Sequence, residues 1–195
     1  MDERTLVALC KNGDRNALQS LYESYAAWMM GISMRYVGDA ERSRDILHDS
    51  FVNIFGSVDG FEYRGVGSLK AWLGRITVNT ALASLQKRHG FLSADEVGDV
   101  TDTQDADGTD REPCVEGDDD TALFEAVSDG TIIRLVGGLP VRLRVVFNLF
   151  IFEDVPHGEI ARRLGISESA SKVRLHRARA LLADALREYI KTAER

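Results

Sequence analysis

Cationic and short polar side chains gather on one face of a helix predicted near the end of this chain, from about Glu168 to Lys191. Leu175, Ala178 and Leu182 recur at helical spacing and predict the buried stripe of that helix. The opposite face suits hydrogen bonds to base edges in the major groove of DNA, with arginines on phosphates. An ordinary solvated basic face is the alternative that this helix alone leaves open. The candidates are Ser169, Lys172, Val173, Arg174, His176, Arg177 and Arg179.

A tight turn before this helix favours the DNA-binding interpretation. Pro156 opens a short helix that ends at Gly165, where a left-handed backbone conformation is needed. Ala161 is small enough for two helices to cross closely, Ile166 plugs the turn, and Ser167 can cap the next helix. This order is typical of a helix-turn-helix, whose second helix enters the major groove.

A second candidate surface is a glycine-rich loop from Gly60 to Gly67 and the helix of about 20 residues that Ser68 is predicted to cap. Aromatic and basic residues around such a loop can stack exposed bases and hold a single-stranded backbone. Phe61 and Tyr63, on the loop, are the more open candidates, whereas the spacing of Trp72 predicts a core residue. By itself this pattern does not specify a nucleic-acid surface.

Helices carry both surfaces. Apolar stripes broken at Gly13-Asp14 and Gly38-Asp39 predict one helical domain over residues 1–90. A second helical block starts near Thr121, breaks at Leu139-Pro140 and runs to the end. We therefore predict an all-α fold. Its two small helical domains, over 1–90 and 128–195, are each expected to bury a core and are joined by a flexible acidic linker over 91–127.

The net charge of −7 is distributed very unevenly. Residues 91–129 carry 14 acidic side chains and one basic side chain, whereas residues 1–90 have a net charge of +1 and residues 130–195 of +5. The stretch 99–120 is rich in Asp, Gly and Thr and cannot bury enough surface to offset its ordering entropy, so we predict a disordered or extended spacer. A calcium loop is rejected, because Thr103 replaces the first ligand and Cys114 the bidentate Glu.

Composition excludes several classes of protein. Cys10 and Cys114 are far apart and predict two free thiols rather than a disulfide or a zinc site. No P-loop or catalytic-triad spacing is found, so we expect no enzyme activity, no cofactor and no small-molecule substrate. No apolar run approaches the roughly 20 residues of a membrane span, and the charged N-terminus does not read as a secretory signal. We expect no membrane insertion and a cytoplasmic location.

In this order, the pieces resemble the two conserved domains of extracytoplasmic-function (ECF) sigma factors of bacterial RNA polymerase, in the sigma-70 superfamily. The resemblance covers both helical blocks. In the first block, Asp45–Phe51 looks like the family's polymerase-binding helix and Phe61–Asn79 like its promoter-melting segment. In the second block, Leu139–Phe147 and Glu159–Arg179 look like the family's reader of the upstream promoter element.

The resemblance implies a transcription initiation factor that binds core RNA polymerase, directs it to promoter DNA and helps open the duplex. It also suggests an anti-sigma partner. Residues implied to dock on the polymerase clamp are Asp45, Leu47, His48, Asp49 and Phe51, with Leu47 and Phe51 as the apolar anchor. Residues implied to lie along the minus-ten element are Phe61, Tyr63, Arg64, Lys70, Arg75, Asn79, Lys87 and Arg88. The candidates on the 168–191 helix would face the minus-thirty-five element.

The sequence departs from the family at a few positions. His48 stands where the family usually has Gln, and Gln86 replaces a frequent Arg. Ala170-Ser171 stands where Thr-Val is common, and because Ser171 points inward we expect slightly weaker packing of that helix. Two rivals remain at this point: a dimeric helix-turn-helix regulator of palindromic operators, and an enzyme whose linker acids bind metal, for which the scattered acids give little support.

Overall fold

The computed structural model describes residues 2–89 and 129–193, and every element in this described part is helical. The predicted all-α fold is confirmed. The flexible linker over 91–127, the rejected calcium loop and Cys114 lie outside the described residues. None of the described helices is long and apolar enough to cross a bilayer.

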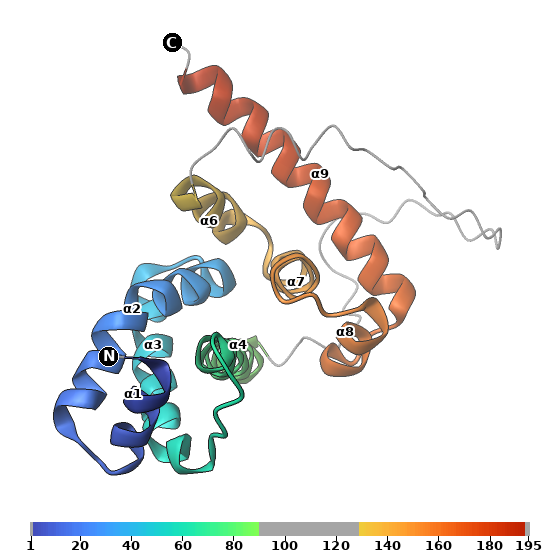
Figure 1. The fold of residues 1–195 in the computed structure, drawn as a ribbon. Helices are drawn as coiled ribbons and strands as arrows, with labels where there is room; N and C mark the ends of the chain where they lie inside the picture. Colours follow the sequence, from blue (N-terminus) through green and yellow to red (C-terminus); the bar gives the residue numbers. More distant parts are fainter. Residues whose placement is uncertain (1, 90–128, 194–195) are drawn as a thin grey trace.

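Four helices make up the N-terminal module, by which we mean residues 2–89. The breaks between them are set by caps that the sequence supplies. The Asp14 and Asp39 side chains accept hydrogen bonds from the backbone N–H groups of Ala17 and Arg42 at 2.8 and 2.9 Å, and Gly38 ends a helix with φ +69°. The helices are α1 (Glu3–Lys11), α2 (Arg15–Val37), α3 (Ala40–Ser57) and α4 (Ser68–His89), with a 3-10 turn at Val58–Gly60 (Figure 1).

Ser68 differs from its predicted role as a cap. It is the first residue of α4, and its hydroxyl donates a hydrogen bond to the Gly65 carbonyl at 2.6 Å. The same oxygen accepts from the Arg64 backbone N–H at 3.2 Å. Ser68 therefore holds the glycine-rich loop against the start of α4.

The C-terminal module, residues 129–193, places the helix-turn-helix at its far end. Pro140 separates the first two helices, as the sequence predicts. A π-helical turn after α7 is not predicted by the sequence, and in it the Glu153 N–H donates to the Asn148 carbonyl five residues back, at 3.2 Å. The elements are α6 (Asp129–Gly138), α7 (Val141–Phe147), the π turn (Asn148–Phe152), α8 (His157–Leu164) and α9 (Glu168–Ala193).

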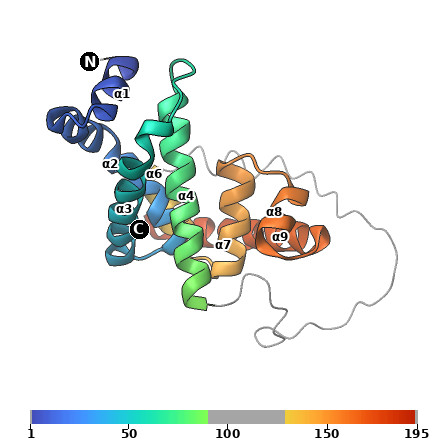
Figure 2. The ribbon, with the colours of Figure 1, turned by 90° about the horizontal axis from the view of Figure 1, so that it is seen from below.

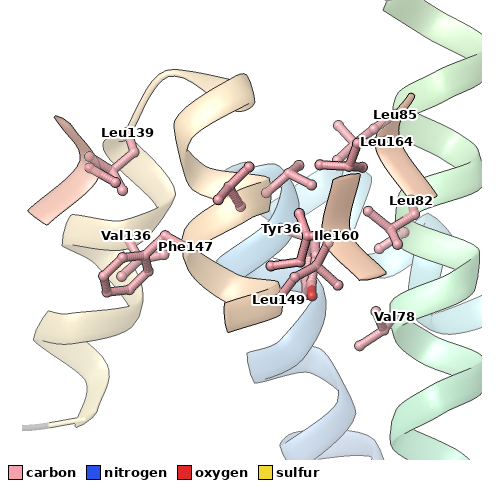
Figure 3. Packing of buried hydrophobic residues seen from close by; sticks show 14 of the residues in the cluster. Tyr36, Val78, Leu82, Leu85, Val136, Leu139, Phe147, Leu149, Ile160 and Leu164 are labelled. Carbon is pink, nitrogen blue, oxygen red and sulfur yellow. The ribbon is translucent and has the colours of Figure 1, made fainter. Parts of the chain in front are cut away.

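One hydrophobic cluster belongs to the N-terminal module alone, and a second is shared by both modules. In the shared cluster, Tyr36 from α2 and Leu82 and Leu85 from α4 pack with Ile160 and Leu164 of α8 (Figure 3). Seen from below, α4 runs between α3 and α7 (Figure 2). The expectation of a separate core for each block is therefore incomplete. A module of about 65 residues buries only about 60% of its unfolded surface, so it gains from a neighbour.

Candidate nucleic-acid interface

The turn between α8 and α9 has the geometry that the sequence predicts. Gly165 adopts a left-handed conformation, with φ +66°, and its N–H donates to the Ala161 carbonyl. Ile166 is partly buried against the shared core. The Ala170 N–H donates to the Ser167 hydroxyl at 3.0 Å, so Ser167 caps α9. The helix-turn-helix prediction is confirmed at the level of backbone geometry.

The predicted reading face of α9 is open to solvent. Leu175, Ala178 and Leu182 are buried, and the side chains on the opposite face are exposed. Val173 is 44% exposed, so this apolar side chain is available for contact with a partner. Arg174 is half-buried, as expected for a residue at the edge of the stripe. The exposed candidates are Ser169, Lys172, Val173, His176, Arg177 and Arg179.

Ser171 points inward, as predicted, and the structure supplies it with a partner. Its hydroxyl oxygen lies 2.9 Å from Nδ1 of His157, and the His157 ring stacks on Phe150 with centroids 4.4 Å apart. Burial lowers the pKa of His157, and the nearby Lys172 lowers it further. This contact fixes the start of α8 against the first turns of α9, which carry the reading face.

Residues of the glycine-rich loop line a hollow at the start of α4, together with Trp72 and Arg75. The expectation that Phe61 is open is wrong. It is only 6% exposed, because it packs into the N-terminal core with its ring 4.8 Å from that of Trp72. Tyr63 is half-buried against the same core. Arg64 remains exposed at the rim, beside Glu62 at 3.2 Å.

The other predicted minus-ten residues follow α4. Lys70, Arg75 and Asn79 are exposed at near-helical spacing, and Lys70 Nζ lies 5.0 Å from the centre of the Trp28 ring. Lys87 is exposed about two turns beyond Asn79. Arg88 belongs to the same helix, but its side chain is outside the described part. The structure thus gathers three polar or cationic groups into one strip beside the hollow.

Helix α3 presents a mixed acidic and apolar face. Asp45, His48 and Asp49 are exposed, and neither carboxylate forms an ion pair among the described residues. The expectation that Leu47 and Phe51 form the apolar anchor is wrong. Both are buried in the N-terminal core, because they continue its i, i+4 stripe.

The exposed apolar groups on this face are ones that the sequence analysis missed. Val52 is 58% exposed and Phe55 39% exposed, and Tyr22 of α2 lies with its ring 4.7 Å from that of the buried Phe51. Val52 and Phe55 continue the line of Asp45 and His48 at spacings of three and four. Assigning the Leu47–Phe51 stripe to the core would have identified them.

Comparisons with known proteins match both modules. Residues 21–90 match the family model of sigma-70 region 2, and residues 129–182 that of sigma-70, region 4. The RNA polymerase sigma-H factor of Pseudomonas aeruginosa is 26% identical over 191 residues, covering 98% of this chain and 97% of that protein. The ECF RNA polymerase sigma factor SigW of Bacillus subtilis is 25% identical, covering 91% of this chain and 93% of that protein. A solved structure, "Structure of CnrH in complex with the cytosolic domain of CnrY", has a TM-score of 0.48 and 21% identity, covering 95% and 97% of the two chains.

Two helical modules, the second ending in a helix-turn-helix, define a DNA-binding protein of the transcription machinery. The chain belongs to the sigma-70 family and is a transcription initiation sigma factor of the ECF type.

Proposed function

We propose that the two modules contact a promoter in different ways while mounted on core RNA polymerase. The observation that supports this is the contrast between a convex, exposed cationic face on α9 and a concave hollow at the start of α4. The convex face fits the major groove of a duplex, whereas a hollow fits a base that has left its stack.

On α9, base contacts are assigned to the first three turns, which follow the turn at Gly165. Ser169, Lys172 and Val173 come first along the helix, and His176 and Arg177 follow one turn later. Arg174 and Arg179 flank this face and suit phosphates, which set the register of the helix without reading sequence. Together these side chains are proposed to read the minus-thirty-five element.

At the hollow, the proposed ligand is an unpaired base of the minus-ten element. The half-buried Trp72 supplies the aromatic wall and the buried Phe61 packs behind it, while Arg64 and Arg75 lie at the hollow as cations for the backbone. Stacking of one base contributes about 1–3 kcal/mol, which offsets the cost of extruding it from the duplex. Capture of bases in this way opens DNA without nucleotide hydrolysis. Tyr63, Lys70, Asn79, Lys87 and Arg88 are proposed to continue the same path.

The exposed face of α3 is the proposed docking site for the polymerase. Asp45, Asp49 and His48 would contact a basic partner, and Val52 and Phe55 replace Leu47 and Phe51 as the apolar anchor. Polar and acidic groups beside an exposed apolar patch are common at protein interfaces, where polar residues lie at the rim. The cytoplasm, where the polymerase works, is the proposed location, and an anti-sigma protein is the proposed regulator.

Run-off transcription with purified core polymerase tests this function. A library of genomic promoters should yield promoter-specific transcripts only when the protein is added. Val52→Glu should reduce transcript yield by about tenfold or more through lost docking, as a charge replaces an apolar contact. Ala27→Glu, an exposed site on α2, is the matched control and should leave yield unchanged. Binding of palindromic duplexes without any transcript would favour the rival helix-turn-helix regulator.

A further inference from the structure

Helix α1 contacts the glycine-rich loop (60–67) at both of its ends. Glu3, in the first turn of α1, accepts a hydrogen bond from the backbone N–H of Gly67 at 3.0 Å, where the loop ends. Lys11, in the last turn of α1, donates one to the backbone carbonyl of Asp59 at 3.0 Å, just before the loop begins. A single helix of nine residues therefore bridges the two ends of the loop.

Helix α1 is itself firmly placed. Its buried face belongs to the N-terminal core, which also holds Phe61 of the loop. The residues of that face are Leu6, Val7 and Cys10. The hydroxyl of Tyr25 on α2 donates a hydrogen bond to the second carboxylate oxygen of Glu3 at 3.3 Å. The Glu3 carboxylate thus joins α1, α2 and the loop, and bonds to a charged acceptor are stronger than bonds between neutral groups.

The loop presents one apolar side chain to solvent, at Val66. It is 95% exposed, whereas the next most exposed large apolar side chain in the described part of the chain, Val52, is 58% exposed. Val66 lies between Gly65 and Gly67, whose φ values of +119° and +86° are rarely adopted by residues with a side chain. A Cβ on either glycine would meet no atom within 4 Å, so conformation rather than space requires glycine there. The loop projects beyond the start of α4 (Figure 2).

Hydrogen bonds from the start of α4 keep the loop in this shape. The backbone N–H and the hydroxyl of Ser68 both donate to the carbonyl of Gly65, at 3.1 and 2.6 Å. The backbone N–H of Ala71 donates to the carbonyl of Gly67 at 3.0 Å. A loop that is already ordered loses little conformational entropy when it binds a ligand. An apolar group held on such a loop, outside the core, is therefore suited to binding.

The surroundings of Val66 favour DNA bases as its ligand. Proteins that distort DNA commonly insert an apolar side chain between neighbouring bases, which unstacks them. Arg64, two residues away, is exposed and lines the hollow proposed to take an unpaired base. A protein partner is less well supported, because one valine offers far less area than the roughly 800 Å² that each side of a stable interface buries.

We propose that Glu3 and Lys11 of α1 are positioning residues for promoter opening. By holding both ends of the loop, they keep Val66 where it enters the base stack at the edge of the opened DNA, while the neighbouring base moves into the hollow. The contact with DNA rests on the minus-ten role proposed above. The hold of α1 on the loop does not depend on that role.

Cleavage by trypsin after Arg64 tests the hold of α1 on the loop, with the full chain and no polymerase. Glu3→Ala should raise the initial rate at this bond about tenfold, the factor expected when a hydrogen bond to a charged group is lost. Glu3→Asp should raise it nearly as much, because it keeps the charge in the first turn of α1 but is one methylene too short for Gly67. Lys11→Met should also raise it.

Glu23→Gln, a change to an exposed acid of α2, is the matched control for cleavage and should leave the rate unchanged. Mass spectrometry identifies the cleaved bond, and circular dichroism should show the same helix content in every variant. Wild-type cleavage rates in both Glu3 variants and in Lys11→Met would overturn the hold of α1 on the loop.

Permanganate footprinting with the assembled holoenzyme tests the effect on opening. Val66→Thr, which has the same shape but a hydroxyl in place of a methyl group, should reduce the open fraction about fourfold, the factor for one buried methyl group. Val66→Ile should retain opening, and Glu3→Asp should reduce it by a factor similar to that for Val66→Thr. A template mismatched over the minus-ten element needs no melting, so it should restore transcription by Val66→Thr and Glu3→Asp.

The possible failures of this test have different meanings. Wild-type opening by Val66→Thr would overturn the role of Val66, and faster cleavage of Glu3→Asp with unchanged opening would overturn the positioning role of α1. Defects that persist on the mismatched template would also overturn the proposal, because they would lie in docking or folding. Absence of transcripts from the wild type on both templates would instead refute the proposed function and leave the hold of α1 on the loop standing.

Discussion

The two proposed DNA-contacting regions are built in opposite ways. In the α8–α9 region, the backbone is regular and the candidate side chains point away from the core, so their types alone indicate what they can contact. In the loop and α4 region, the aromatic residues whose type suits base stacking pack on the N-terminal core, with Phe61 buried and Tyr63 and Trp72 half-buried. Phe61 supports the hollow from behind, and its neighbours Arg64 and Arg75 remain accessible.

This difference has a physical basis. A long helix with one buried stripe leaves its other face free, so helical spacing decides which side chains are available. A loop has no such periodicity, and an aromatic ring in it gains about 1.5–3 kcal/mol by burial wherever the core has room. The type of an aromatic residue in a loop therefore does not decide whether it packs in the core or binds a ligand. Here Phe61 is structural, whereas Val173 on α9 is exposed.

The largest effect that would sharpen this comparison is on stability. Phe61→Ala should lower the free energy of unfolding by about 3–5 kcal/mol, because it removes a packed ring from the N-terminal core. Val66→Ala, in the same loop but 95% exposed, should change it little. Denaturant unfolding followed by circular dichroism measures both. Similar midpoints for the two variants would mean that Phe61 is not part of the core in solution.

In the α8–α9 region, Arg177→Ala should weaken duplex binding and leave folding unchanged. The loss should be about 1–3 kcal/mol at a promoter whose minus-thirty-five element is intact, as expected for one base contact. Lys191→Ala, near the far end of α9, is the control. Electrophoretic mobility shift with the assembled holoenzyme measures the loss. An equal loss on promoters with a scrambled upstream element would assign Arg177 to phosphates instead.

In the loop and α4 region, Arg75→Ala should affect strand opening more than duplex binding. Arg75 lines the hollow at the start of α4, so its removal takes a cation from the proposed path of the single strand. The slope of log affinity against log salt for single-stranded DNA is negative, and its magnitude should decrease by roughly 0.7. Permanganate footprinting should show fewer open complexes at unchanged duplex occupancy. Loss of duplex binding with unchanged opening would contradict the assignment.

The smallest expected effect concerns the His157–Ser171 contact. Because burial lowers the pKa of His157 below its ordinary 6.5, the folded chain favours the neutral ring. Its contribution to stability is present above pH 6.5 and is lost as the pH falls through the lowered pKa. When the pH is lowered from about 7.5 to about 5.5, the melting temperature should decrease more for the wild type than for His157→Gln. Parallel pH profiles would show that the ring does not titrate with folding.

Much of the local structure could be predicted from the sequence. The caps at Asp14 and Asp39 and the left-handed glycines at 38 and 165 mark helix ends, because these residue types satisfy free backbone groups or adopt positive φ. The reading face of α9 follows from its spacing. The apolar anchor on α3 could not be assigned in this way. Both Leu47 and Val52 are apolar, and only the packing of α3 against α2 and α4 decides that Leu47 is buried and Val52 exposed.

By itself, the sequence determined where the helices lie, the turn that presents α9, and membership of the chain in its family, because capping and helical periodicity act over a few residues. Only the tertiary structure decided that Phe61 is core, that Val52 and Phe55 are exposed, and that the modules share a cluster across α2 and α4. Those outcomes depend on which surfaces meet over long separations in the chain. No local pattern encodes the backbone contact between Gly38 and Gly137, a hundred residues apart.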